Sequence, residues 1–286
     1  MTALFACGDT LTKYMGGFLP VVLLLWVRYA VQAGTMGLWL ARRGRIGFAT
    51  AHPKFQWMRG TLLLITSGMS FTGLQLMPVA EFTALGMLTP VIVTMLVAWV
   101  LREPVSRMRW ALVCGGFIGA LIVIRPGSGV FGWAAVFPLL MASCYGAFQV
   151  LTSRLASLES PYTTQFYTGF AGTLLVTPLL LLNAGELVHA VQRASAVHIV
   201  GMLGIGFFAT LGHLCLIFAF NRAPMATLMP FVYVQIVGAL VLSWLVFKHV
   251  PDAWAWGGMA VIAACGAGSA LLNVRHPESP VEADTI

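Results

Sequence analysis

The ionisable residues that could carry chemistry lie inside long apolar segments. Asp9, Arg28 and Glu81 each interrupt a stretch that is otherwise uncharged or nearly so. A charge within the hydrocarbon of a membrane is costly, so such residues mark a substrate or ion pathway by default. At 1.5 Å per residue, Asp9 would lie roughly 10 Å and Arg28 roughly 12 Å from the same end of two consecutive antiparallel helices. We expect Asp9 and Arg28 to be able to meet, and Lys13 to be able to pair with Glu81 about one turn nearer that end.

These charges admit two interpretations. In the first, the pairs lock the outer half of a helix bundle, or Lys13 simply extends its ammonium group to the membrane surface. In the second, Asp9, Arg28 and Glu81 line a cavity, where Arg28 holds an anionic part of a substrate and the acids hold a cation or a proton. The residues alone leave both interpretations open.

A second set of candidates is polar and aromatic, and it is spread over later segments. Ligand pockets are mostly apolar with a few placed hydrogen-bonding groups, and tyrosine faces suit a flat or partly aromatic solute. The same residues could instead join helices to one another, and packing is the first interpretation for the histidine. Tyr233 is favoured among them, because Pro230 should open the helix backbone close to it. The predicted substrate-binding set therefore adds to Asp9, Arg28 and Glu81 the residues Gln75, Tyr145, Gln149, His213, Tyr233 and Gln235.

The composition is that of a membrane protein. Of the 286 residues, 59% are hydrophobic and only 9% are charged, whereas a soluble domain carries about 25% charged residues. The formal net charge of +7 does not indicate nucleic-acid binding, because the cations border apolar segments instead of forming one basic face. There, Lys and Arg orient helices in the membrane. A polytopic membrane protein follows.

Several kinds of site are missing from the sequence. It contains no HExxH, GxSxG, Walker or EF-hand motif. The five cysteines show no CxxC spacing and fall within apolar segments, which is typical of small buried residues and not of disulfides or metal ligands. We predict no catalytic residues, no metal and no cofactor.

Ten membrane spans can be placed, and the charged residues orient them. Eleven Lys and Arg residues lie at the loops after every second span and four on the opposite side, so the positive-inside rule predicts that both termini are cytoplasmic. The predicted spans are 2–15, 20–41, 59–77, 79–101, 109–125, 131–152, 163–183, 198–220, 225–247 and 253–274.

A sequence repeat divides these spans into two groups of five. At a separation of 146 positions, Pro78 matches Pro224 and Trp110 matches Trp256. An odd number of spans in each half makes the two halves cross the membrane in opposite senses. The predicted fold is all-α and integral to the membrane, with two inverted five-helix repeats, residues 1–126 and 127–274, around a central cavity. Residues 275–286 form a polar tail that we expect to be disordered.

The chain resembles the ten-span branch of the drug/metabolite transporter superfamily, with two EamA-type domains. The resemblance rests on the Pro-x-Ala openings at Pro78 and Pro224, on Pro90, on Arg102-Glu103-Pro104, on Trp110 before a glycine-rich helix, and on Pro230-Phe-Val-Tyr233. The family usually has a second Glu where this chain has His249, so no role of that Glu is carried over.

The resemblance implies a secondary transporter of the inner (plasma) membrane that works by alternating access. Its implied substrate is a small organic solute: an amino acid or other metabolite, a nucleoside-like compound, S-adenosylmethionine, a flavin or an amphipathic drug. Protons or a counter-solute, membrane lipid, and a monomeric or homodimeric state are open possibilities. The alternatives are a membrane-embedded enzyme acting on lipid or prenyl substrates and a non-transporting receptor or assembly subunit. The enzyme is disfavoured because Asp9 and Glu81 differ in predicted depth and the histidines are scattered.

Overall fold

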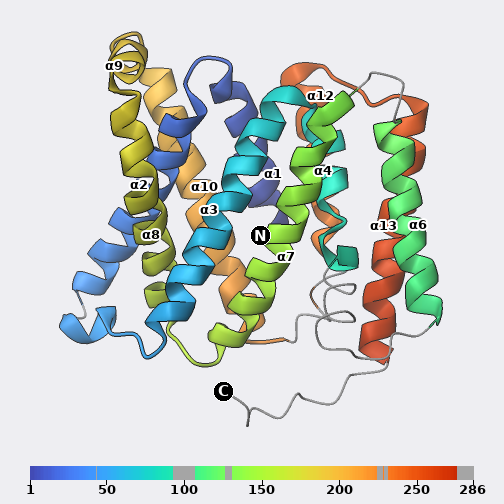
Figure 1. The fold of residues 1–286 in the computed structure, drawn as a ribbon, viewed down its shortest axis with the longest axis horizontal. Coiled ribbons are helices and arrows are strands. Elements are labelled where there is room, and N and C mark those ends of the chain that lie inside the picture. The colour runs from blue at the N-terminus through green and yellow to red at the C-terminus, as the bar shows by residue number, and fades with distance from the viewer. Residues whose placement is uncertain (43, 93–106, 126–130, 224–227, 229–230, 276–286) are drawn as a thin grey trace.

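The computed structural model describes residues 1–42, 44–92, 107–125, 131–223, 228 and 231–275. Within these ranges every regular element is a helix (Figure 1). The predicted landmarks Arg102, Glu103, Pro104, Pro224, Ala226 and Pro230 and the tail from 276 onward lie outside them. The elements are α1 (Thr2–Gly16), α2 (Val21–Ala41), η1 (Arg45–Phe48), α3 (Pro53–Leu76), α4 (Val79–Gly86), α6 (Arg107–Ile124), η2 (Gly132–Ala135), α7 (Val136–Ala156), α8 (Pro161–Leu182), α9 (Ala184–Gln192), α10 (Ala196–Phe220), α12 (Val234–Phe247) and α13 (Ala253–Arg275).

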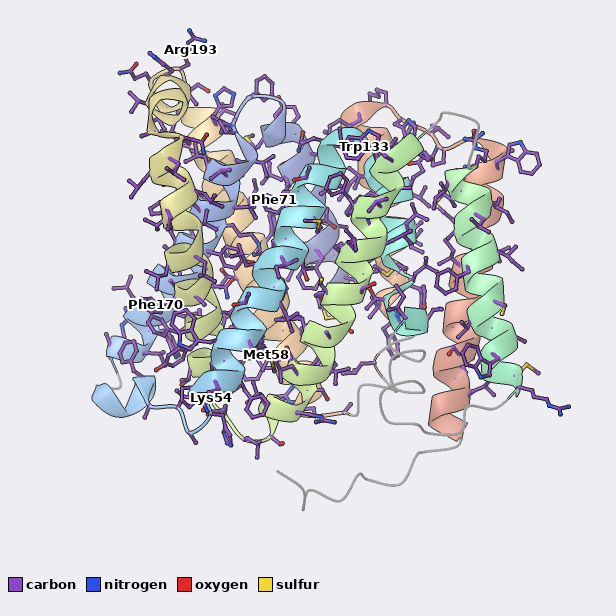
Figure 2. All side chains as sticks on the ribbon, viewed as in Figure 1. Lys54, Met58, Phe71, Trp133, Phe170 and Arg193 are labelled. Atoms are coloured by element: carbon purple, nitrogen blue, oxygen red, sulfur yellow. The ribbon has the colours of Figure 1, made fainter. Side chains whose placement is uncertain are left out.

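The bundle is built to sit in a membrane. In the described ranges, four helices are long and apolar enough to cross one, namely Val21–Ala41, Gly132–Ala156, Pro161–Leu182 and Ala196–Phe220, and three shorter helices are also apolar. Large apolar side chains project outward around the bundle (Figure 2), and Leu182 is 82% exposed. Such a surface would be a liability in water but is suited to lipid. The chain is a multi-pass integral membrane protein.

The two ends of the bundle are marked by α9 and by Lys54, and we name them the α9 end and the Lys54 end (Figures 1 and 2). The short helix α9 was not predicted, because the segment between the spans ending at 183 and starting at 198 lacks a long apolar run. Helix α3 begins at Pro53, six residues before the predicted start at 59. Proline is favoured in a first helical turn, where its missing N–H is no loss.

Helix α4 is interrupted by a turn at Met87 and Leu88, shortly before Pro90. Proline has no N–H to donate to the carbonyl four residues earlier, which here belongs to Gly86. The Thr89 hydroxyl donates to that Gly86 oxygen instead, at 2.7 Å. The regular helix stops at Gly86, beside the wall of the central cavity.

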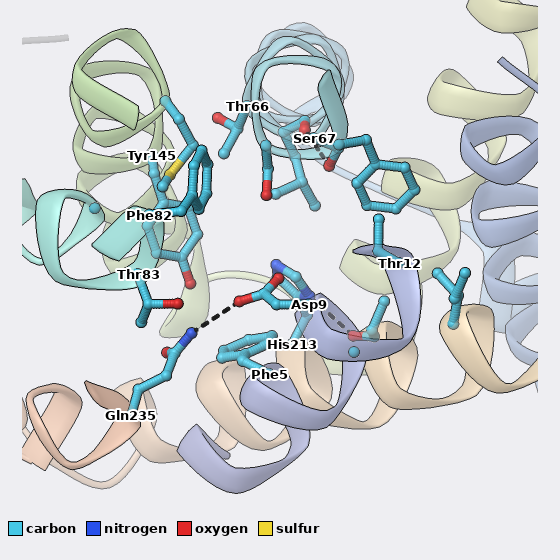
Figure 3. Close-up of a pocket in the computed structure, with 18 of the residues that line it drawn as sticks. Phe5, Asp9, Thr12, Thr66, Ser67, Phe82, Thr83, Tyr145, His213 and Gln235 are labelled. Carbon is cyan, nitrogen blue, oxygen red and sulfur yellow. Dashed lines mark hydrogen bonds between the residues drawn. The ribbon is translucent and has the colours of Figure 1, made fainter. Parts of the chain in front are cut away.

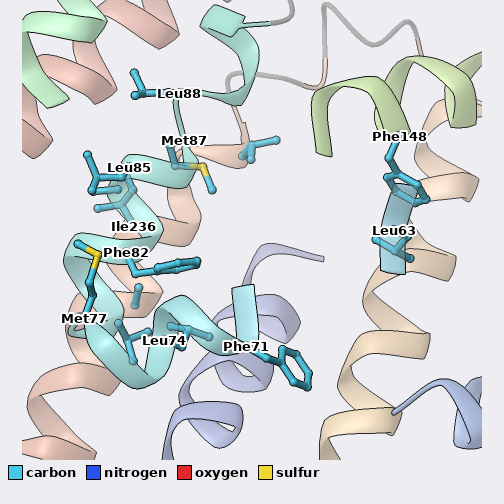
Figure 4. Packing of buried hydrophobic residues seen from close by; sticks show 14 of the residues in the cluster. Leu63, Phe71, Leu74, Met77, Phe82, Leu85, Met87, Leu88, Phe148 and Ile236 are labelled. Atoms are coloured by element: carbon cyan, nitrogen blue, oxygen red, sulfur yellow. The ribbon is translucent and has the colours of Figure 1, made fainter. Parts of the chain in front are cut away.

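Helices from distant parts of the sequence pack in pairs. The closest pairings are α2 with α8, α6 with α13 and α3 with α7, while α1 packs against α3, α10 and α12. The buried apolar cluster draws on α3, α4, α7 and α12 and includes Leu63, Leu74, Phe82, Phe148 and Ile236 (Figure 4). The core therefore joins the beginning of the chain to its end.

Helices α6 and α13 approach each other through glycine. A methyl group placed on Gly258 would lie 2.6 Å from the Gly119 carbonyl oxygen, and one on Gly119 would lie 2.9 Å from the Gly258 carbonyl oxygen. Small residues on both helices allow this close packing, and the contact is internal to the chain. Gly115 also faces α13, at Cys265.

We predict that Gly258→Ala destabilises the protein by about 1–3 kcal/mol, because the methyl group meets backbone that cannot rotate away. Thermal unfolding in detergent should show a lower midpoint. Gly257→Ala is the matched control, since the neighbouring position has nothing within 4 Å. Equal midpoints for the two variants would contradict the close contact.

Candidate functional site

A narrow central cavity of about 110 Å³ lies among α1, α2, α3, α4, α7, α10 and α12 (Figure 3). Its wall is mostly apolar, with a few polar groups that converge on one space. The polar lining comprises Asp9, Thr12, Arg28, Thr66, Ser67, Ser70, Thr83, Tyr145, His213 and Gln235, and the aromatic lining Phe5, Phe71 and Phe82.

Asp9 and Gln235 form one polar edge of the cavity. The Gln235 side-chain nitrogen donates a hydrogen bond to the Asp9 carboxylate at 3.2 Å, joining α1 to α12 (Figure 3). Both were predicted as site residues from separate arguments, but their pairing was not expected. Asp9 also lies near Arg28 without forming an ion pair within 4 Å, so the expected Asp9–Arg28 salt bridge is replaced by this amide contact.

Arg28 is buried in the wall and is held from one side. It is only 4% exposed, and its guanidinium lies over the Tyr29 ring, 4.5 Å from the ring centre. The Tyr29 hydroxyl is fixed in turn by Ser67 at 2.9 Å. Within the described part of the chain, Arg28 Nη1 has no hydrogen-bond partner. A buried guanidinium with an unused N–H can donate to a carbonyl or an anionic group that comes within reach.

His213 belongs to the cavity lining and keeps one ring nitrogen unpaired within the described ranges. Its Nδ1 lies 2.8 Å from the Ala209 carbonyl oxygen. Because a carbonyl only accepts, Nδ1 carries the proton in the neutral ring, which leaves Nε2 with a lone pair. Nε2 is buried and has no partner among the described residues. The ring packs edge-on against Phe5 at 4.8 Å and Phe148 at 5.8 Å.

The remaining predicted tyrosines and glutamines divide between cavity and packing. Tyr145 lines the cavity and stacks on Phe148. Gln149 is buried one turn along α7 toward the Lys54 end, outside the lining. Tyr233 is also outside the lining, and its ring packs against Gly266 of α13. Gln75 donates to the Thr12 carbonyl oxygen at 3.3 Å and joins α3 to α1.

Glu81 lies between the cavity and the α9 end, not in the cavity wall. Its carboxylate is 2.7 Å from His249 Nε2, and the residue is 2% exposed. Lys13, the expected partner, instead donates to the Leu74 and Met77 carbonyl oxygens at 2.6 and 2.8 Å. The end of α3 has carbonyls without helical partners, which attract an ammonium group. Glu81 therefore pairs with His249, and Lys13, which could have paired with Glu81, binds the end of α3.

A second buried cation, Arg59, was missed because sequence reasoning placed it at a membrane border. It is 0% exposed, donates to Thr152 at 2.8 Å and to Thr168, and lies over the Phe148 ring at 4.6 Å. The early start of α3 puts this residue inside the bundle. Thr164 and Thr168, four residues apart on one helix face, were the sequence feature that could have indicated a partner for a buried cation. Phe148 thus separates Arg59 from His213.

The lining combines aromatic faces with hydrogen-bonding groups. Aromatic side chains offer faces, Arg28 offers a donor, and Asp9 and His213 Nε2 offer acceptors. Within the described ranges, no group of three His, Cys, Asp or Glu residues could hold a metal ion.

Comparisons with known proteins identify the family. The model of the EamA-like transporter family matches residues 132–272. A riboflavin transporter of Rhizobium johnstonii is 29% identical over 82% of this chain and 77% of its own length. An S-adenosylmethionine uptake transporter of Rickettsia prowazekii is 21% identical over 89% of this chain and 84% of its own. A crystal structure has a TM-score of 0.67 at 17% identity, over 97% of this chain and 96% of that one.

The chain belongs to the drug/metabolite transporter superfamily. It is a transporter and not an enzyme. The predicted superfamily is thereby confirmed.

We predict that Gln235→Leu destabilises the protein by about 1–3 kcal/mol, because it leaves the buried Asp9 carboxylate without its amide donor. Asp9→Asn should remove most of that penalty, so the double variant should cost less than the sum of the single ones. Thermal unfolding of all four proteins measures the coupling. Gln75→Leu is the control, because it removes a side-chain hydrogen bond that does not involve Asp9. Its effect on stability should add to that of Asp9→Asn. If the effects of Gln235→Leu and Asp9→Asn also add, the Asp9–Gln235 contact is contradicted.

Proposed function

We propose that this protein is a secondary transporter that moves a flat heteroaromatic metabolite across the inner membrane by alternating access. The observation that carries the proposal is the central cavity, where Arg28, His213 and the Asp9–Gln235 pair face one another between aromatic walls. The relatives named as riboflavin and S-adenosylmethionine transporters also support transport of a small metabolite.

The helix contacts support ten spans in two inverted halves, residues 1–126 and 127–274. The first half would contribute α1, α2, α3, α4 and α6, and the second α7, α8, α10, α12 and α13. Taken in chain order, the counterparts are α1 and α7, α2 and α8, α3 and α10, α4 and α12, and α6 and α13. Exchanging each helix for its counterpart turns the α3–α7 contact into α10–α1, the α3–α8 contact into α10–α2, and the α1–α12 contact into α7–α4. All of these pairs pack together, and α2–α8 and α6–α13 map onto themselves. A two-fold relation between inverted halves explains this pattern.

The distribution of cations supports the orientation. Lys54 lies at the Lys54 end (Figure 2), and most other Lys and Arg residues outside the core belong to loops that the predicted spans place on the same side. The positive-inside rule makes that side cytoplasmic. The α9 end then faces away from the cytoplasm. By the same rule we propose that both ends of the chain belong to the cytoplasmic side, with α1 starting beside the central cavity, midway through the bundle (Figure 1).

The substrate we favour is riboflavin or a flavin-like ring. Its ring carbonyls can accept from Arg28, its imide N–H can donate to His213 Nε2 or Asp9, and its flat faces can stack between Tyr145 and the phenylalanines. The name of the Rhizobium relative supports this choice. We propose Asp9, Arg28, Tyr145, His213 and Gln235 as the substrate-contacting residues, because they line this cavity, and Gln75, Glu81, Gln149 and Tyr233 as supporting residues, because they lie outside the lining.

We predict that purified protein quenches riboflavin fluorescence and that Arg28→Met weakens binding about tenfold to a hundredfold, the loss expected for one charge-assisted hydrogen bond. Arg154→Met is the matched control, because Arg154 is exposed at the end of α7. Riboflavin uptake into proteoliposomes then tests transport. Binding of S-adenosylmethionine in place of riboflavin would make the ring assignment wrong, and absence of uptake for both would contradict the proposed transport.

A further inference from the structure

Thr83 of α4 belongs to the wall of the central cavity, and its hydroxyl lacks a hydrogen-bond partner in the part of the chain that the structure describes. The residue is only 2% exposed, and its Oγ1 atom is buried. Burying a hydroxyl without a partner costs free energy, so an unpartnered group of this kind needs an explanation.

Other buried threonines in the helices avoid this cost through their own backbone. A threonine hydroxyl in a helix can donate to the carbonyl oxygen four residues earlier. The Thr10 hydroxyl donates to the Ala6 oxygen at 2.8 Å, and the Thr66 hydroxyl, in the same cavity wall, donates to the Leu62 oxygen at 2.8 Å. Within the described ranges, Thr83 does not form this bond.

The Thr83 hydroxyl is turned toward the edge of the cavity that Asp9 and Gln235 form. Figure 3 shows it pointing into the cavity on the side where the Gln235 amide reaches the Asp9 carboxylate. Helix α4, which carries Thr83, packs against α12 and α1, which carry the other two residues. Three polar groups from three helices therefore belong to one edge of the cavity.

Asp9 keeps acceptor capacity at this edge. A carboxylate can accept about four hydrogen bonds. The Gln235 amide donates to Oδ2 of Asp9, which leaves Oδ1 able to accept from a ligand. The Thr83 hydroxyl can donate at the same edge. A carboxylate acceptor together with a hydroxyl donor is complementary to a ring edge that carries an N–H next to a carbonyl.

We propose that Thr83 is a specificity-determining residue that binds, together with Asp9, a lactam or imide edge of the substrate. The N–H of that edge donates to Asp9, and the adjacent carbonyl accepts from the Thr83 hydroxyl. This rests on the proposed function and states which edge of a flavin-like ring lies on this side of the cavity. An imide has a second carbonyl, which is left for Arg28.

A measurement without ligand tests the state of the hydroxyl. Thr83→Val keeps the shape of the side chain and removes an unpartnered buried hydroxyl, so in the full chain in detergent it should raise the midpoint of thermal unfolding by about 2–4 °C. Thr10→Val is the matched control, because that hydroxyl already donates to Ala6, and its midpoint should not rise. A midpoint of Thr83→Val that stays the same or falls shows that the hydroxyl has a partner within the protein, and overturns the proposal.

Fluorescence titration then tests the ligand edge. Thr83→Val should raise the dissociation constant of riboflavin about threefold to tenfold, the loss expected for one neutral hydrogen bond. Thr83→Ser, which keeps the hydroxyl, and Thr10→Val should bind riboflavin like the parent. In 3-methylriboflavin a methyl group replaces the imide hydrogen, so the parent should bind it about tenfold more weakly, and Thr83→Val should change that affinity less than it changes the affinity for riboflavin.

The outcomes separate this proposal from the proposed function. Equal affinity of the parent for the two flavins, or equal losses in Thr83→Ser and Thr83→Val, overturns the edge assignment while leaving riboflavin as the ligand. If the parent does not bind riboflavin, the flavin assignment fails, and the midpoint of Thr83→Val still supports or overturns the assignment of this hydroxyl to a ligand.

Discussion

Inside the hydrocarbon of a membrane, a polar or charged side chain has no water to bond with, so its partner comes from the protein or from a ligand. The structure meets this requirement unevenly. Arg59 donates to threonine oxygens and lies over an aromatic face, outside the cavity lining. Arg28 rests on Tyr29 and belongs to the cavity lining. Each keeps one buried nitrogen without a hydrogen-bond partner in the described part of the chain, so the position beside the cavity is what distinguishes Arg28 from Arg59.

Sequence reasoning reached the class of protein and five of the polar residues that line the cavity, but it did not predict which residues pair with one another. Asp9, Arg28, Tyr145, His213 and Gln235 were found because an ionisable or polar residue in an apolar span is informative by itself. Their pairings were not, since Gln235 and His249 come from helices and loops whose neighbours only the fold determines. Arg59 was misplaced for the same kind of reason, because a helix that starts at Pro53 carries it inward.

The cavity and the Glu81–His249 pair share helix α4. This helix carries Glu81 directly before Phe82 and Thr83 of the cavity wall, so a movement that separates the pair also moves part of that wall. By contrast, α6 and α13 meet backbone to backbone at Gly119 and Gly258 and leave no room for sliding through side chains. We therefore regard the α6–α13 pair as the stationary part of the bundle and α4 as the part whose position can respond to a ligand.

The bond between Asp9 and Gln235 joins residues that are 226 positions apart. During synthesis, α1 enters the membrane long before α12 exists, because the chain is made from its N-terminus. For that interval the Asp9 carboxylate lacks its amide donor, and α1 also lacks α10, against which it packs. The first helix therefore has to wait in a partly hydrated or otherwise protected place, and the binding cavity is completed only when almost the whole protein has been inserted.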